Sequence, residues 1–174
     1  MRQVRYGVAM SLDGYIAGPR GEADWIVHDP DIDFGAIFGR FDTLLVGRKT
    51  FDAMRAMGGG GGGMRGVETV VISRTMQPSE HPGLRIVNDA APFVAALKRE
   101  AGKDVWLFGG GVLFRELLAA GLVDGVDTAI VPVLLGGGIP FLPPPASKAK
   151  LALTGQRVYE KSGIVALEYD VVRE

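Results

Sequence analysis

The chain has 174 residues, of which 47% are hydrophobic and 22% charged, and its formal net charge at pH 7 is −1. This is an ordinary globular composition, so we expect a single domain over residues 1–174 that is large enough for a substantial core. The near-neutral charge argues against nucleic acid as a partner, and the lack of cysteine excludes disulfides, thiolate metal sites and a cysteine nucleophile.

Targeting and metal-binding signals are also missing from the sequence. The two histidines, His28 and His81, lie close to prolines in polar stretches, so we expect no metal site. The first residues lack the apolar segment of a signal peptide, and no stretch reaches the roughly 20 apolar residues that cross a bilayer. These features predict a cytoplasmic protein with no membrane contact.

The first elements are a strand, a turn and a helix. Residues 2–10 are rich in strand formers, SLDG follows as a turn, and residues 15–17 form a short extended piece. Residues 31–41 then place apolar side chains at helical spacing, and Pro30 suits the entry to that helix.

A second strand and helix follow directly. Residues 43–46 form an apolar run that predicts a buried strand, and GRKT leads into a helix that ends near Met57. Residues 58–63 are all glycine, and holding a glycine run in one backbone conformation carries a large entropy cost. We expect a flexible loop there, with a mobile lid as the alternative.

The middle of the chain repeats the alternation. Residues 68–72 and 84–87 predict two strands, and residues 90–101 a helix capped by Asn88 or Asp89.

A strand, a glycine turn and a helix form the most informative stretch. Residues 105–108 predict a buried strand, Gly109 to Gly111 follow at once, and helical spacing then continues to a stop at Gly121. Such a turn brings bare backbone and the positive end of a helix dipole to one place, which suits a phosphate group. The alternative is a tight turn without a ligand.

The chain closes with strands. Residues 126–133 predict an apolar strand, LLGGGIPFLPPP a glycine- and proline-rich loop, and residues 151–160 and 164–172 a hairpin. The alternation predicts an α/β fold whose sheet is largely parallel, covered on both faces, and edged by an antiparallel hairpin. The apolar C-terminal strands would also suit a homodimer.

Polar or glycine-rich turns follow three of the predicted strands. They come after Val46, Ile72 and Phe108. Ligands of open α/β sheets bind outside the carboxyl ends of the strands, so the three turns could hold one extended phosphorylated ligand. The cations and hydroxyls available there are Arg48, Lys49, Arg74, Thr50, Ser73 and Thr75.

Five motifs in order resemble the dihydrofolate reductase-like superfamily, and within it the riboflavin-biosynthesis reductase branch, the RibD C-terminal domain. They are SLDGYIAG, LLVGRKTFDAM, VVISRT, WLFGGGVLFRELLAAGLVD and PVLLGGGIPFL, and they extend over essentially the whole chain. The resemblance implies a three-layer fold with a central sheet of about eight strands, and NADPH as cofactor. The zinc deaminase domain often fused to that reductase has no counterpart here, because its cysteine ligands are missing.

The resemblance also implies the cofactor-binding residues. It places Ala9 and Ile16 at the nicotinamide, and Ser73 and Arg74 near the 2′-phosphate. The pyrophosphate and adenosine side would be held by Gly47, Arg48, Lys49, Thr50, Phe108, Gly109, Gly110, Gly111, Val112 and Leu113.

The resemblance identifies the substrate-site residues less clearly than the cofactor-binding residues. Trp25 and Asp31 fall near the positions where folate reductases carry their active-site tryptophan and acidic residue, and Asp33 is a rival to Asp31. A carboxylate favoured by the helix dipole is the structural alternative for both. Asp13 in the SLDG turn is a further candidate proton donor, although a turn aspartate commonly caps its own backbone.

Two functions are consistent with these residues. The first is an NADPH-dependent reductase that transfers hydride to a small heterocycle, such as a pterin or a ribosylated aminopyrimidine. The second is an NADPH- or nucleotide-binding domain without turnover that has a regulatory or assembly role, because fold alone does not decide function.

Overall fold

A computed structural model describes residues 1–56 and 66–173 of the chain. The elements in order are β1 (Val4–Ser11), β2 (Tyr15–Ala17), α1 (Phe34–Gly39), β3 (Phe41–Gly47), α2 (Arg48–Ala56), β4 (Glu68–Ile72), a 3₁₀ turn (Pro78–Glu80), β5 (Arg85–Val87), α3 (Ala90–Leu97), β6 (Asp104–Gly109), α4 (Gly111–Ala119), β7 (Gly125–Val131), β8 (Ile139–Pro140), β9 (Lys150–Tyr159) and β10 (Ile164–Val172).

The centre of the molecule is an eight-stranded sheet with the order β5-β4-β3-β6-β1-β7-β10-β9. The strands from β5 to β7 run parallel, and β10 and β9 add an antiparallel edge. A second, two-stranded sheet joins β2 and β8. The predicted α/β architecture with about eight strands and an antiparallel C-terminal hairpin is confirmed.

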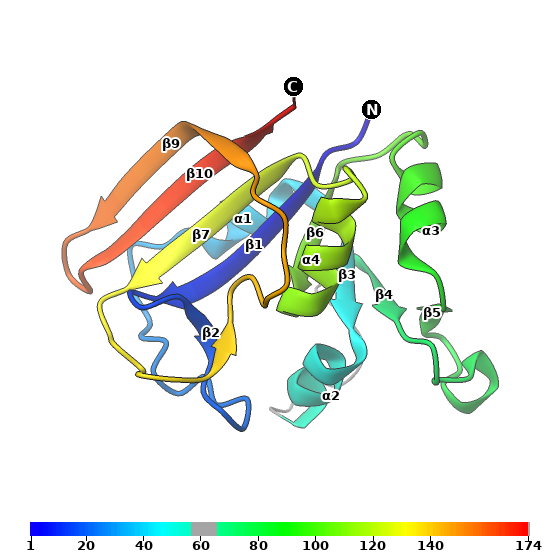
Figure 1. The fold of residues 1–174 in the computed structure, drawn as a ribbon, viewed down its shortest axis with the longest axis horizontal. Coiled ribbons are helices and arrows are strands. Elements are labelled where there is room, and N and C mark those ends of the chain that lie inside the picture. The colour runs from blue at the N-terminus through cyan, green and yellow to red at the C-terminus, as the bar shows by residue number, and fades with distance from the viewer. Residues whose placement is uncertain (57–65, 174) are drawn as a thin grey trace.

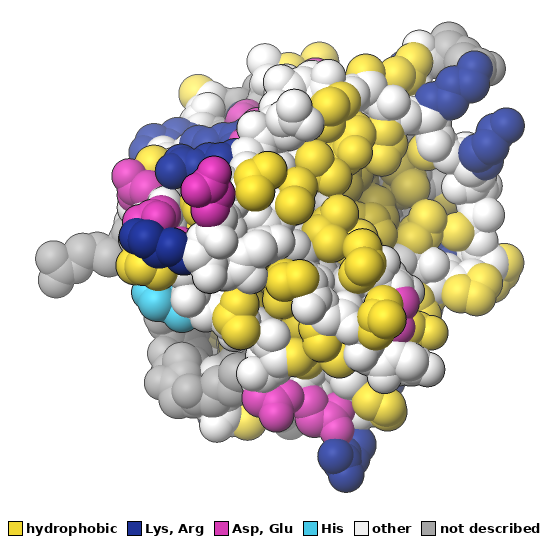
Figure 2. Space-filling model, turned by 90° about the vertical axis from the view of Figure 1, so that its left-hand side faces the viewer, with side chains coloured by type: hydrophobic (Ala, Val, Ile, Leu, Met, Phe, Trp, Pro, Cys, Tyr) yellow, Lys and Arg dark blue, Asp and Glu magenta, His cyan; other side chains and the backbone are white. Residues whose placement is uncertain are grey.

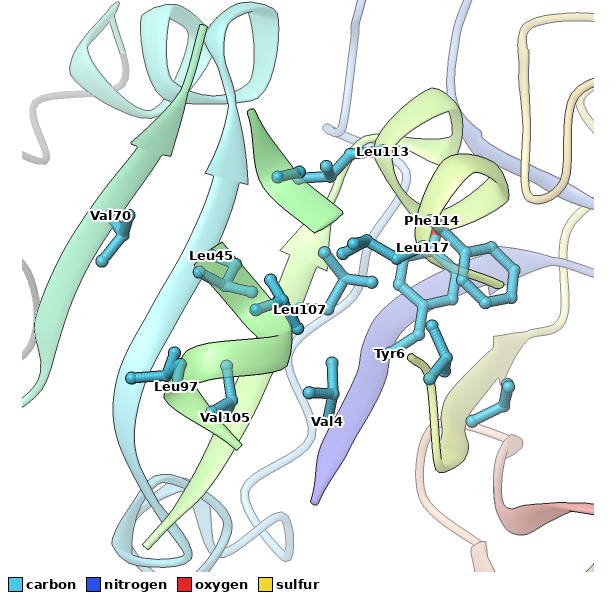
Figure 3. Packing of buried hydrophobic residues seen from close by; sticks show 14 residues of the cluster. Val4, Tyr6, Leu45, Val70, Leu97, Val105, Leu107, Leu113, Phe114 and Leu117 are labelled. Atoms are coloured by element: carbon cyan, nitrogen blue, oxygen red, sulfur yellow. The ribbon is translucent and has the colours of Figure 1, made fainter. Parts of the chain in front are cut away.

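Helices cover the two faces of the parallel part of the sheet, as Figure 1 shows. On one face α3 and α4 enclose the larger core, where the ring of Tyr6 on β1 stacks on Phe114 of α4 at 3.9 Å (Figure 3). On the other face α1 and α2 enclose a smaller core around Trp106, which stacks on Phe38 of α1. Alternating strand residues supply the two cores, because successive side chains of a strand point to opposite faces.

The predicted helix over residues 31–41 is too long, because α1 starts at Phe34 and Phe41 already belongs to β3. Asp29 and Pro30 begin a tight turn in which the N–H of Ile32 donates to the carbonyl of Asp29. Asp and Pro at the first two positions favour such a turn over a helix. The ring of Phe41 is instead buried against Trp106.

Other boundaries differ by a few residues. The helix predicted over 90–101 ends at Leu97, and the strand predicted over 126–133 ends at Val131, just before a proline that lacks the ladder N–H. The short strand β8 lies inside the segment expected to be a loop. The glycine run 58–63, predicted as a loop or lid, lies outside the described residues.

The expected cover on both faces is incomplete. The strands β10 and β9 extend beyond the helices, and Figure 1 shows no helix in front of them. Leu151, Leu153 and Val158 on β9 are accordingly exposed. In the two ranges that the structure describes, no helix combines the length and apolar character needed to cross a membrane.

Candidate functional site

The three polar turns predicted after strands lie side by side at one edge of the sheet. In the ladder Gly47 at the end of β3 pairs with Ile72 at the end of β4, and Val46 pairs with Gly109 at the end of β6. A side chain added at Gly47 would come within 3.6 Å of the backbone nitrogen of Gly110. The structure therefore brings the GRKT, SRT and GGG turns together.

Polar contacts connect these turns. Arg48 at the start of α2 donates through Nη1 to the hydroxyl of Thr75 at 2.9 Å, and its Nε lies 3.5 Å from Asp52. Arg74 is 83% exposed and reaches to 3.8 Å from the carboxylate of Glu116 on α4. Both guanidinium groups thus lie at the rim of the same edge, exposed enough to meet an anionic ligand.

Ser73 has a structural task in the same turn. Its side chain is buried, and its hydroxyl oxygen accepts hydrogen bonds from the backbone N–H groups of Thr75 and Met76. This arrangement holds the turn in shape, and the hydroxyl also lies 3.5 Å from the hydroxyl of Thr75.

The glycine turn offers bare backbone where α4 begins. Gly110 is the residue that precedes the helix, and no side chain caps the helix start in the part of the chain that the structure describes. A Cβ at Gly110 would meet only the hydroxyl of Thr50, at 3.3 Å. The first-turn N–H groups of α4 and its dipole suit a phosphate group, so this edge fits the diphosphate of a dinucleotide cofactor.

The residues that follow Gly110 differ in their exposure and in the size of their side chains. Val112 is exposed at the helix start, whereas Leu113 is buried and packs in the larger core (Figure 3), so its side chain does not face the predicted cofactor. Gly111 allows the end of β8 to approach, since a Cβ there would lie 2.7 Å from the carbonyl of Pro140.

The strand β8 connects the glycine turn to the predicted nicotinamide end. It pairs with β2, the strand that contains Ile16, and the N–H of Phe141 donates to the carbonyl of Gly14. Ala9 on β1 and Trp25 both pack against the third, small core cluster of Val131, Tyr159 and Ile164. Ala9 and Trp25, which are separated along the chain, thus lie against the same cluster, and Ile16 lies on the strand that pairs with β8.

Asp13 ties two loops together. Its carboxylate accepts hydrogen bonds from the hydroxyl of Ser11 at 2.7 Å and from the N–H groups of Leu135 and Gly136. These bonds hold the pKa of the Asp13 carboxyl below its usual value, the bond from Ser11 contributing most. A carboxyl that is stabilised in its charged form is a poor proton donor.

Asp31 does not open the helix, contrary to the prediction, because it precedes α1 by three positions. Its exposed carboxylate pairs with Nζ of Lys161 at 2.8 Å. Asp33 is the residue that caps α1, accepting a hydrogen bond from the N–H of Ala36 at 2.8 Å. The structural alternative raised for a helix-start carboxylate therefore describes Asp33.

The buried carboxylate of this segment belongs to Asp29, which sequence reasoning did not single out. Asp29 is 0% exposed and accepts from the N–H of Asp31 at 2.8 Å and from the N–H of Ser162 at 3.1 Å. It thereby joins the loop that contains Trp25 to the β9–β10 turn. The signal in the sequence was the Asp-Pro pair, which is typical of the first two residues of a turn.

We expect Asp29→Asn to lower stability at neutral pH and to flatten its dependence on acid. Hydrogen bonding from Ser162 and then from the N–H of Asp31 holds the pKa of Asp29 below its usual value. A lowered folded-state pKa contributes stability above the ordinary value near 4, and this is lost as pH falls through the folded value. Thermal melts between neutral and acid pH test this.

Asp31→Asn serves as the control for that experiment, because its exposed ion pair should change stability by no more than about 0.5 kcal/mol. Equal acid sensitivity of Asp29→Asn and the unaltered protein would contradict the expectation.

Comparisons with protein families, related sequences and solved structures agree with one another. The profile of the RibD C-terminal domain family matches residues 2–165. The YyaP protein of Bacillus subtilis (strain 168) is 32% identical over 178 aligned positions, covering 97% of this chain and 94% of YyaP.

Two solved structures share the fold. A putative riboflavin biosynthesis protein from Shewanella sp. PV-4 superimposes with a TM-score of 0.81 at 27% identity, over 99% of this chain and all of that one. Dihydrofolate reductase from Enterococcus faecalis, in complex with NADP(H), gives a TM-score of 0.68 at 21% identity, over 97% and 94% of the two chains. The overall architecture is therefore that of the dihydrofolate reductase-like proteins.

Proposed function

This chain belongs to the RibD C-terminal domain family, and on that premise we propose that it is an NADPH-dependent reductase acting on a small heterocycle. The substrate class we propose is a pterin or a ribosylated aminopyrimidine.

The observation that carries the proposal is the shared edge formed by the three strand-end turns. Arg48 and Arg74 supply cations at its rim, and the bare backbone at Gly110 leaves room beside the start of α4. A similarly folded dihydrofolate reductase binds NADP(H). The cofactor would lie along this edge, with its pyrophosphate at the glycine turn and its nicotinamide toward Ala9 and Ile16.

The reaction would add a hydride and a proton to a C=N bond or an imine-like carbon of the substrate. NADPH supplies the hydride when bound and leaves as NADP⁺. The chain's part is to hold the acceptor carbon against the nicotinamide ring, with Trp25 and Ala9 at the edge of that space. The proton would come from solvent, because Asp13 and Asp29 are held in their charged forms and Asp31 is paired with Lys161.

Because these carboxyl groups are charged or ion-paired, and are therefore poor proton donors, they favour a second candidate function. It is an NADPH-binding domain without turnover. Purified protein distinguishes the two by titration calorimetry with NADPH, followed by NADPH oxidation with a panel of pterins and aminopyrimidines. Binding with oxidation supports the reductase, binding without oxidation across the panel supports the second candidate, and lack of binding contradicts both.

We expect the protein to bind NADPH at least about tenfold more tightly than NADH. A 2′-phosphate held by Arg48 and Arg74 would gain charge-assisted bonds of roughly 1.5–3 kcal/mol each, and 1.4 kcal/mol corresponds to a factor of ten. Titration calorimetry with both cofactors measures the ratio. Arg74→Gln should reduce it while leaving the affinity for NADH unchanged, and equal affinities of the unaltered protein would refute the assignment.

A further inference from the structure

A carboxylate joins the turn after β1 to the loop after β7. Oδ1 of Asp13 accepts hydrogen bonds from the hydroxyl of Ser11 at 2.7 Å and from the N–H of Leu135 at 3.1 Å. Its Oδ2 accepts from the N–H of Gly136 at 2.7 Å. The hydroxyl oxygen of Ser11 accepts in turn from the N–H of Tyr15 at 3.0 Å. Both oxygens of the carboxylate are therefore used, and together they hold the loop to the turn.

Hydrogen-bond donors, and not a cation, hold this carboxylate. Within the described residues, every interaction that lowers the pKa of Asp13 is a hydrogen bond, the one with Ser11 contributing most. In Figure 1 the end of β1 lies at the left, and Figure 2 views the molecule from that side, with most Lys and Arg side chains at the margins of the view. The side-chain link between turn and loop thus depends on the acceptor oxygens of Asp13.

The loop leads directly into β8, which lies between the two ends of the proposed cofactor site. Just before β8, a Cβ at Gly138 would clash with the carbonyl of Ala17 on β2, the strand that contains Ile16. At the end of β8, the carbonyl of Pro140 lies close to Gly111 of the glycine turn. The loop therefore determines where β8 lies against β2.

The two ends of the site differ in how they are supported. The glycine turn is held between β6 and α4, both of which pack in the main body of the molecule. The strand β8 has only two residues and belongs to a two-stranded sheet with β2. The nicotinamide end is thus the part of the site that needs the link through Asp13.

We propose that Asp13 is a positioning residue for the nicotinamide end of the cofactor, which it sets by fixing the loop 133–138, and with it β8, against β2. The inference rests on the proposed function, because NADPH is the ligand whose nicotinamide would lie beside Ile16. Asp13 needs no contact with the reacting atoms for this role. If the loop is released, only a fraction of the molecules has the site in its binding form, and the apparent affinity falls by that fraction.

The role requires a carboxylate, which an amide of the same size does not replace. A carboxylate accepts hydrogen bonds at both oxygens, whereas an amide has one acceptor oxygen and an NH₂ group that only donates. In Asp13→Asn this NH₂ group would face the N–H of Leu135 or the N–H of Gly136, so one of these donors loses its partner. Asp13 is exposed, so the nearly isosteric variant should fold.

Titration calorimetry with two ligands tests the role. One is NADPH, and the other is adenosine 2′,5′-bisphosphate, which lacks the nicotinamide. Asp13→Asn should weaken NADPH binding about tenfold or more and leave the affinity for adenosine 2′,5′-bisphosphate unchanged, whereas a general distortion of the fold would weaken both. Asp13→Ala removes both acceptor oxygens and should lose at least as much. Amide hydrogen exchange over residues 133–141 should become faster in both variants, which detects release of the loop without any ligand.

Asp33→Asn is the matched control. Asp33 is also an exposed carboxylate that accepts a backbone N–H, that of Ala36, but it lies at the start of α1, so its variant should bind both ligands as the unaltered protein does. Unchanged NADPH affinity or unchanged exchange in Asp13→Asn, or an equal loss for both ligands, would overturn the positioning role alone. If the unaltered protein binds neither ligand, the proposed function fails, and this inference fails with it.

Discussion

Gly110→Val should weaken NADPH binding by about 100-fold or more and leave the protein folded. The backbone of Gly110 has φ −89°, which valine also adopts, and a Cβ there would meet only the Thr50 hydroxyl at 3.3 Å. The branched side chain would instead occupy the space beside the first-turn N–H groups of α4, where the pyrophosphate would lie. Titration calorimetry measures the affinity, and circular dichroism and thermal melts verify the fold.

Gly39→Val provides the control for the added volume. A Cβ at Gly39 meets nothing within 4 Å, and this glycine lies at the end of α1, away from the three strand-end turns. Its variant should bind NADPH as the unaltered protein does. Unchanged NADPH affinity in Gly110→Val would show that the glycines serve the turn alone.

Arg5→Met should lower the free energy of unfolding by about 2–4 kcal/mol, because the partly buried Asp127 loses its nearest partner and is left with the half-exposed Arg40 at 3.5 Å. Arg5 is 4% exposed and lies near the start of β1. It contacts Asp127 through two nitrogens, at 2.7 and 3.0 Å, and Asp170 through a third at 3.0 Å. At 2–4 °C per kcal/mol the melting temperature should fall by about 4–16 °C.

Two further variants make this test specific. Arg20→Met removes an 87% exposed arginine that pairs with Glu22, and should change stability by no more than about 0.5 kcal/mol. Arg5→Met combined with Asp127→Leu should recover much of the loss, because both buried charges are then gone. A loss below about 1 kcal/mol in Arg5→Met, or a double variant less stable than the single one, would contradict this account.

Strands whose residues form continuous apolar runs were predictable with little error. The strand over 68–72 was predicted with the bounds that β4 has, and residues 105–108 lie within β6. Central strands of a parallel sheet are buried on both faces, so their composition alone distinguishes them from the turns that follow. The strand ends, and with them the positions of the three turns, follow from that pattern.

The region from Trp25 to Phe41 was predicted less well, because its conformation depends on residues far along the chain. Asp29 is buried beside Ser162, 133 positions away, whose N–H donates to its carboxylate. Phe41 joins β3 because Trp106 covers its ring. Local spacing favoured a longer helix there, and these tertiary contacts outweighed it.

By itself, the sequence determined the order of the elements, the largely parallel sheet and the placing of glycines and cations after three strands. These features depend on local composition and on the rule that parallel strands end at one edge. Only the tertiary structure decided which acidic side chain is buried, that Leu113 faces the core, and that β9 and β10 extend beyond the helices. Burial and face depend on which distant segments pack together, and no local pattern of residues records that.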